Sequence, residues 1–139
     1  MWIADTCVLI DIFQDHDGHG IHSGQCLHEL IPEGVAVCPV TIVEMAPSFD
    51  GRIELQKSFL AGCHISFTEP WTIRDTETAH EAWARVTAAR RHERLPRRPV
   101  ADILIGAFAA NRTGLVTRNP EDFRRWFPKL RLKVPAHPR

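Results

Sequence analysis

Short apolar runs alternate along this chain with longer segments in which apolar residues recur every three or four positions. The short runs predict buried strands, and the longer segments predict amphipathic helices. Strands are expected at 2–4, 35–38, 64–67, 115–116 and 130–134, and helices at 8–14, 23–31, 41–45, 51–61, 75–93, 100–110 and 124–126. This alternation favours an α/β fold, in which a mostly parallel central sheet carries helices on both faces.

Two polar residues are placed to begin helices. Thr6 is expected to cap the first helix, and Asp50 is expected to cap the helix at 51–61. In the latter helix, the side chains expected to face the core are Ile53, Leu55, Phe59 and Leu60.

The chain has 139 residues, enough for one domain spanning 1–139 with a substantial core. No apolar run reaches the length of a membrane span, so no membrane association is expected. The first residues lack the basic region and cleavage site of a signal peptide, which favours a cytoplasmic location.

The four cysteines are far apart in the sequence, and no pair has the C-x-x-C spacing of a zinc or redox site. Each lies in an apolar context and is expected to be a reduced core residue. These residues are Cys7, Cys26, Cys38 and Cys63.

The net charge of zero hides a division between the two halves of the chain. Residues 1–69 contain two basic and ten acidic residues, whereas residues 70–139 contain fifteen basic and seven acidic ones. The basic half is rich in arginine, which suits bidentate phosphate contacts. Interleaving of the halves in the fold would instead give an ordinary mixed surface, so the asymmetry alone favours a nucleic-acid partner only weakly.

His16, His19 and His22 lie in or next to a polar, glycine-containing segment. Histidines are common metal ligands, but no spacing here places these three on one rigid element. A solvated loop is therefore the favoured interpretation.

Acidic residues recur at the predicted ends of strands. Asp5 follows the first strand, Glu44 lies just beyond the second, Asp102 is in the first turn of a helix, and Asp122 follows the strand at 115–116. Parallel strands bring their carboxyl ends to one edge of a sheet, so these acids could converge. Two of them have ordinary alternatives, because Glu44 could be a surface residue and Asp102 could complement a helix dipole.

Several carboxylates in one crevice would repel one another unless a cation lay between them. Oxygen ligands without histidine or cysteine partners favour Mg²⁺ or Mn²⁺ over Zn²⁺. Such ions commonly bind phosphate groups and activate water. The acids therefore indicate chemistry on phosphate esters.

Four segments resemble the motifs of PIN-domain proteins, and most closely those of VapC-type toxin ribonucleases from toxin–antitoxin pairs. They are IADTCVLI at 3–10, VTIVE at 40–44, ADILIGA at 101–107 and LVTRNPEDF at 115–123. The resemblance covers nearly the whole chain, and the motifs occur in the family's order. It implies a single PIN-like three-layer sandwich and an Mg²⁺- or Mn²⁺-dependent endoribonuclease that hydrolyses RNA phosphodiester bonds.

The resemblance further implies an acidic catalytic and metal site made by Asp5, Glu44, Asp102 and Asp122, with polar support from Thr6, Thr117 and Asn119. Glu121 stands beside Asp122 and is the alternative fourth acid. Two departures from the family pattern are Gly106, where alanine is commoner, and Pro47, which follows Glu44 closely.

An arginine-rich stretch spans the end of the longest predicted helix and the loop after it, and is expected to guide RNA to the acids. It comprises Arg90, Arg91, Arg94, Arg97 and Arg98. A helix dipole also favours cations at a C-terminus, which accounts for the first two arginines but not for Arg97 and Arg98.

Other protein classes fit less well. A receiver-like domain requires paired early acids and a lysine directly after a late strand, and a haloacid-dehalogenase-type phosphatase requires aspartate where Cys7 stands. The remaining alternative is a PIN fold that binds RNA or protein without cutting, which fold alone cannot exclude.

The resemblance implies two protein partners, a small inhibitory antitoxin and a second copy of the chain in a homodimer. The helices at 8–14 and 23–31 are short, and their apolar residues could form a groove for an antitoxin helix. These residues are Leu9, Phe13, Leu27, Leu30 and Ile31. The competing interpretation is that all five belong to the core.

Overall fold

A computed structural model describes residues 1–15, 18–90 and 100–137. Its centre is a sheet of four short strands in the order β2-β1-β3-β4, and every neighbouring pair is parallel. The strands are β1 (Trp2–Ala4), β2 (Val35–Ala36), β3 (Gly114–Val116) and β4 (Leu132–Lys133). The predicted α/β class with a parallel sheet is confirmed.

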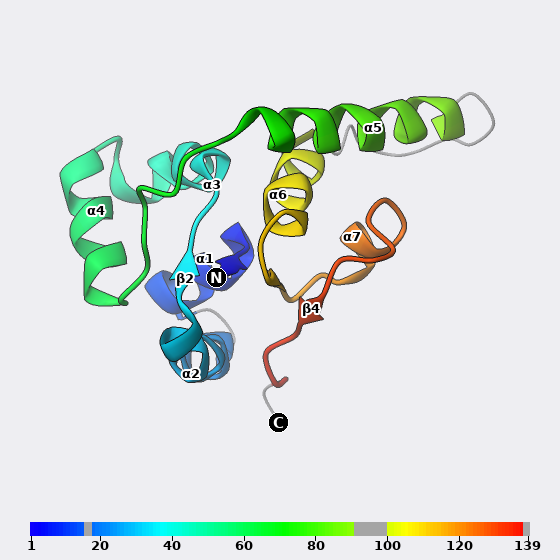
Figure 1. The fold of residues 1–139 in the computed structure, drawn as a ribbon. Coiled ribbons are helices and arrows are strands. Elements are labelled where there is room, and N and C mark those ends of the chain that lie inside the picture. Colours follow the sequence, from blue (N-terminus) through cyan, green and yellow to red (C-terminus); the bar gives the residue numbers. More distant parts are fainter. Residues whose placement is uncertain (16–17, 91–99, 138–139) are drawn as a thin grey trace.

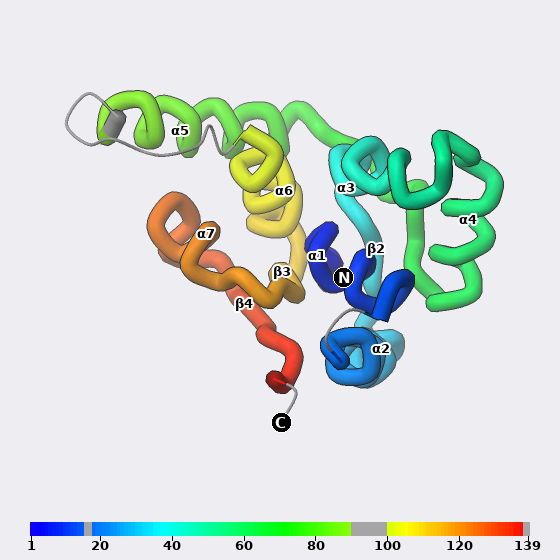
Figure 2. The backbone as a smooth tube through the Cα atoms, turned by 180° about the vertical axis from the view of Figure 1, so that it is seen from behind, coloured from blue at the N-terminus to red at the C-terminus, as the bar shows by residue number. Residues whose placement is uncertain are grey.

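In the described part of the chain, seven helices surround this sheet. They are α1 (Thr6–Gln14), α2 (His19–Leu30), α3 (Pro39–Glu44), α4 (Ile53–Gly62), α5 (Ile73–Arg90), α6 (Val100–Ala110) and α7 (Glu121–Arg124), with single 3₁₀ segments at Ile31–Glu33 and Ala46–Phe49. In Figure 1, α5 extends across the top above α6, while α4 lies on the side away from α7 and β4. The reverse view shows α1 and α2 beside the strands, and these two helices contact each other extensively (Figure 2).

The core occupies both faces of the sheet because successive side chains of a strand point to opposite sides. Trp2 and Ala4 of β1 pack into a cluster with α1, α2 and α4, whereas Ile3 packs on the other face against α6. A third cluster joins α5 to α6. Helices therefore cover both faces, as the strand–helix alternation predicts.

Several element boundaries differ from the prediction, among them that of the last helix, α7, which covers Glu121–Arg124 rather than 124–126. The expected strand at 64–67 forms only a single bridge, between Ala36 and Ser66, and His64 has a left-handed backbone with φ of 59° that interrupts extended pairing. Helix α2 begins at His19, four residues early, so part of the expected loop is helical. Helix α3 begins at Pro39, whose fixed φ and missing N–H suit a first helical turn.

The predicted cap and the predicted inner face of α4 are partly wrong. Asp50 lies before the helix in a left-handed conformation, and Arg52 is the capping residue. Ile53 and Leu55 are 45% and 44% exposed, while Gln56 is buried and donates a hydrogen bond to the Ile42 carbonyl at 3.1 Å. The later start of the helix and this polar anchor rotate its first turn away from the core.

The proposed antitoxin groove is mostly core. Leu9, Leu27 and Leu30 are buried in the cluster around β1, and Ile31 is half-buried. Of the five residues, only Phe13 is largely exposed, at 42%, and its ring lies 4.4 Å from that of Phe49, centre to centre. The α1–α2 contact uses these apolar residues itself, so they do not form an open groove.

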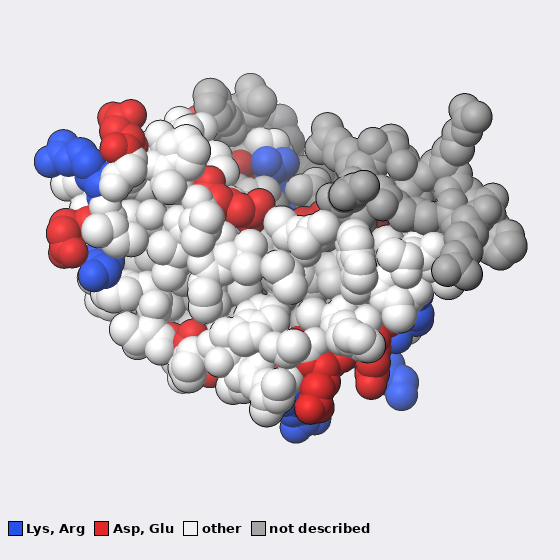
Figure 3. Space-filling model, turned by 90° about the horizontal axis from the view of Figure 1, so that it is seen from above, with Lys and Arg blue, Asp and Glu red and all other residues white. Residues whose placement is uncertain are grey.

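All four cysteines are free thiols, as predicted. Cys26 and Cys38 are buried, whereas Cys7 and Cys63 are half-buried. Within the described ranges, no helix combines the length and the apolar character needed to cross a membrane. The face seen from above is largely uncharged in its described part, with acidic and basic side chains scattered over it (Figure 3).

Candidate active site

Asp5 occupies the turn between β1 and α1. Its backbone is extended, with φ of −69° and ψ of 153°, and its Oδ1 accepts a hydrogen bond from the Thr6 N–H at 2.8 Å. Asp5 is therefore the N-cap of α1, and the prediction that Thr6 fills this position is wrong by one residue. The cap frees the Thr6 hydroxyl for other contacts.

The second oxygen of the Asp5 carboxylate is held from the neighbouring strand. Thr117 directly follows β3, and its Oγ1 donates to Asp5 Oδ2 at 2.7 Å. The Cys7 thiol donates to the same oxygen at 3.4 Å. With its side chain held on both oxygens and only 6% exposed, Asp5 has a nearly fixed position.

Thr6 links Asp5 to α3. Its hydroxyl donates to Glu44 Oε1 at 2.6 Å and shares a further hydrogen bond with Thr41 Oγ1 at 3.0 Å. Glu44 is the last residue of α3, and its side chain is exposed. The structure thus brings two of the four predicted acids together, one buried and one open to solvent.

Burial is the largest influence on the Asp5 carboxyl and raises its pKa above the ordinary value. Hydrogen bonds from Thr117, Cys7 and Thr6 oppose this shift, and the negative charge of Glu44 adds to it. A cation beside both carboxylates would remove the repulsion and favour ionised Asp5.

Cys7 remains a thiol beside this carboxylate. Burial, followed by the nearby Asp5 charge, raises its pKa to about 12. The protonated sulfur can therefore act as a hydrogen-bond donor to Asp5, and it is a weak nucleophile.

The other two predicted acids are placed differently. Asp102 is half-buried in the first turn of α6, a helix that contacts both β1 and α3. Asp122 lies in the first turn of α7 with an exposed side chain, and Glu121 beside it is exposed as well. The Glu121 carboxylate is paired with Arg124.

Thr117 and Asn119, the residues predicted to support the acids from the β3 side, are hydrogen-bonded to each other. The Asn119 backbone N–H donates to Thr117 Oγ1 at 3.0 Å, so Thr117 accepts from Asn119 and donates to Asp5. This relay fixes the threonine hydroxyl. The Asn119 side chain itself is exposed.

The carboxylate pair supplies oxygen donors of the kind that Mg²⁺ and Mn²⁺ bind. Within the described part of the chain, no group of three or more His, Cys, Asp or Glu side chains is close enough together to hold a metal ion. The donor chemistry of Asp5 and Glu44 fits a hard cation, whereas the arrangement of Asp102 and Asp122 does not complete a cage around it.

The predicted arginine strip falls mainly where the structure gives no description. Arg90 is the last residue of α5, and Arg91, Arg94, Arg97 and Arg98 lie outside the described residues. Their role in RNA binding stays a prediction.

One ion pair next to the site was not predicted from the sequence. Arg118 follows Thr117 and pairs with Asp11 of α1, which is buried. Asp11 is separated from Arg118 by 107 positions, so no local pattern links them. The only available signal is an aspartate on the inner face of an otherwise apolar helix, which calls for a cationic partner.

No protein-family model matches the chain, and no curated protein matches it. Among solved structures, the chain is similar to one chain of the crystal structure of VapBC2 from Rickettsia felis bound to a DNA fragment from their promoter. The TM-score is 0.70 at 16% sequence identity, and the match covers 97% of this chain and 98% of that chain. This likeness over nearly the full length confirms the PIN-like α/β fold that the resemblance to VapC-type toxins implies.

Proposed function

We propose that this protein is a metal-dependent endoribonuclease and the toxin of a toxin–antitoxin pair. The observation that carries the proposal is the joining of Asp5 and Glu44 through Thr6 at the carboxyl edge of a parallel sheet, where the Thr6 N–H donates to Asp5 and the Thr6 hydroxyl donates to Glu44. Ligand sites of open α/β folds lie at this edge. The fold shared with VapBC2 supports the toxin assignment.

Mg²⁺ or Mn²⁺ would be held by Asp5 and Glu44, while Asp102 and either Asp122 or Glu121 would act as further acids of the site without closing a cage around the ion. When bound, such an ion supplies charge stabilisation for a phosphodiester and activates water. Two threonines position the carboxylates that would hold the ion. Thr117 holds Asp5 Oδ2, and Thr6 aligns the Glu44 carboxylate.

RNA is the proposed substrate, and the arginines at 90–98 would contact its phosphates. The proposed partner is a small antitoxin, supported by the VapBC2 complex with the same fold. Of the apolar residues expected to bind the antitoxin, Phe13 is the one whose side chain is largely exposed. Its ring packs against Phe49 and Phe59. A homodimer and a cytoplasmic location complete the proposal.

The test is cleavage of a structured RNA by protein purified free of host nucleases, with and without Mg²⁺ or Mn²⁺. Asp5→Asn, Glu44→Gln and Asp102→Asn should each reduce cleavage by about 100-fold or more while the fold is retained.

Asp50→Asn is the matched control, because Asp50 is an exposed aspartate outside the site and asparagine tolerates its left-handed backbone. It should cleave RNA like the unchanged protein. Full activity in any of the three site variants, or in the presence of excess chelator, would contradict the nuclease assignment. RNA binding without any cleavage would favour the non-catalytic alternative.

A further inference from the structure

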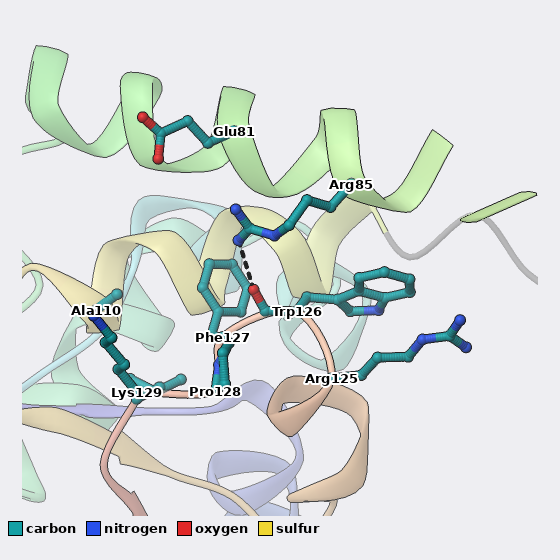
Figure 4. Close-up of a pocket in the computed structure, with 9 residues that line it drawn as sticks. Glu81, Arg85, Ala110, Arg125, Trp126, Phe127, Pro128 and Lys129 are labelled. Atoms are coloured by element: carbon teal, nitrogen blue, oxygen red, sulfur yellow. Dashed lines mark hydrogen bonds between the residues drawn. The ribbon is translucent and has the colours of Figure 1, made fainter. Parts of the chain in front are cut away.

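A cavity of about 500 Å³ lies between α5 and the segment that follows α7. Glu81 and Arg85 of α5 form one wall, and residues 125–130 form the other (Figure 4). Ala110, the last residue of α6, closes one end. Asp102 and Ala110 are eight residues apart on α6, so the cavity lies roughly 12 Å along this helix from Asp102.

The floor of this cavity is aromatic and firmly held. Trp126 and Phe127 are only 9% and 6% exposed, and the Phe127 ring packs against Gly106 of α6. Arg85 Nη2 donates to the Trp126 carbonyl at 2.8 Å, so α5 fixes the backbone of this segment. The Arg125 guanidinium lies 4.6 Å above the Trp126 ring. The floor is thus formed in advance of any ligand.

The rim of the cavity is cationic. Arg85, Arg125 and Lys129 line it together with one carboxylate, that of Glu81. In Figure 4, Arg125 and Lys129 reach out on opposite sides of Phe127 and Pro128, and Arg85 faces them from α5. Positive charge on two sides of an apolar floor matches a ligand with an apolar centre and anionic ends.

We propose that this cavity binds a single-stranded RNA segment away from the bond that is cut. One base lies against Pro128 and the small exposed parts of Trp126 and Phe127, and Arg125 and Lys129 contact the phosphates on either side of it. Single-stranded nucleic acids bind other proteins by this combination of apolar or aromatic platforms with flanking cations. The inference rests on the proposed function, since it takes RNA as the ligand.

RNA is favoured over an acidic peptide by the combination of floor and rim. Carboxylates alone would satisfy the cations but would leave the exposed apolar lining, chiefly Pro128, without a partner. A nucleotide satisfies both, because its phosphate is anionic and its base has an apolar face.

The experiment measures binding without cleavage. A fluorescein-labelled single-stranded oligoribonucleotide is titrated with Asp5→Asn protein, and anisotropy is followed over a range of KCl concentrations. Adding Arg125→Ala and Lys129→Ala should weaken binding at least tenfold at low salt. It should also reduce the slope of log K against log salt by about 1.4, which corresponds to two lost phosphate contacts on a single strand.

The control is the pair Arg52→Ala and Lys57→Ala in the same background. Both residues are exposed cations at or on α4, on the side of the molecule away from α7 (Figure 1). The affinity and salt slope of this control should not change. The charge-preserving pair Arg125→Lys and Lys129→Arg should retain most of the affinity, which separates loss of charge from loss of fold.

Equal affinities and slopes in the alanine pair and the control would overturn the proposal. So would competition by polyglutamate as effective as that by unlabelled RNA, because the cavity would then recognise charge alone. If the unchanged protein does not cut RNA but the alanine pair weakens binding, the nuclease assignment fails and the RNA site stands. If the protein cuts RNA but the alanine pair leaves RNA binding unchanged, only the proposed RNA site is wrong.

Discussion

Arg118 donates two hydrogen bonds to the Asp11 carboxylate, at 2.5 Å from Nε and 2.9 Å from Nη2. Ser23 of α2 donates a third bond to Asp11, at 3.1 Å. The interaction ties α1 and α2 to the residue after Thr117, whose hydroxyl holds Asp5. The segment that positions the candidate catalytic acid is thus anchored by an ion pair of its own.

Arg118→Ala should destabilise the protein by about 3 kcal/mol, because it leaves the buried Asp11 carboxylate without its cation. Urea unfolding at neutral pH measures this difference. Ser23→Ala removes only one neutral donor and should cost about 1 kcal/mol. Equal losses in the two variants would show that the arginine adds nothing beyond a single hydrogen bond.

Thr117→Val keeps the shape of the side chain but removes the hydroxyl that donates to Asp5 Oδ2. Because this hydrogen bond lowers the pKa of Asp5, its loss should raise that pKa further. If Asp5 acts in its ionised form, the acid limb of the pH–cleavage profile should move to higher pH, with an activity loss of about tenfold near neutrality.

Thr117→Ser is the matching control for that substitution, because it restores the donor. Its pH profile should coincide with that of the unchanged protein. An acid limb at the same pH in Thr117→Val would separate Thr117 from the ionisation of Asp5.

A buried carboxylate on α5 predicts acid-sensitive stability. Burial alone would raise the pKa of Asp75, but hydrogen bonds from Arg112 and Asn111 outweigh it and hold that pKa below its ordinary value of 3.8. A lowered folded-state pKa means that ionised Asp75 stabilises the fold above the ordinary pKa. This contribution is lost as the pH falls through the folded-state value.

Asp75→Asn should therefore cost about 3 kcal/mol at pH 7, and the difference from the unchanged protein should shrink below about pH 4. Urea unfolding across this pH range provides the measurement. Asp50→Asn, at an exposed site, should show no such pH-dependent difference. A constant gap for Asp75→Asn from pH 7 to pH 3 would contradict the ionic origin of the stabilisation.

Gly106→Ala should destabilise the protein by about 1–3 kcal/mol, because an added Cβ would collide with the Phe127 ring. Gly24→Ala in α2 is the control. A Cβ there meets no atom within 4 Å, and alanine favours a helix interior, so this change should stabilise by up to about 1 kcal/mol. Thermal unfolding compares the two. A neutral Gly106→Ala would mean that the Phe127 ring can move aside.

The periodic apolar pattern by itself determined the fold class, the parallel strands β1, β2 and β3, and most of the helices. These features depend on which side chains must leave water, and the spacing of apolar residues records that directly. The position of Asp5 after the first strand also followed from the sequence, because a carboxylate at the end of an apolar run marks the edge of the sheet. The exact ends of helices were harder to predict, because neighbouring residues compete to cap the same helix. Asp5 and not Thr6 caps α1, and α4 starts two residues later than expected.

Only the tertiary structure decided which residues meet. The Thr6 contact with Glu44 crosses 38 positions and the Arg118 pair with Asp11 crosses 107, so neither leaves a periodic signal in the chain. The burial of Leu9, Leu27 and Leu30 likewise depended on α1 packing against α2. Amphipathic spacing shows which face of a helix is apolar. It does not show which element covers that face, because the hydrophobic effect is non-directional and any apolar surface of matching shape can bury it. The packing of the whole chain therefore decides the partner.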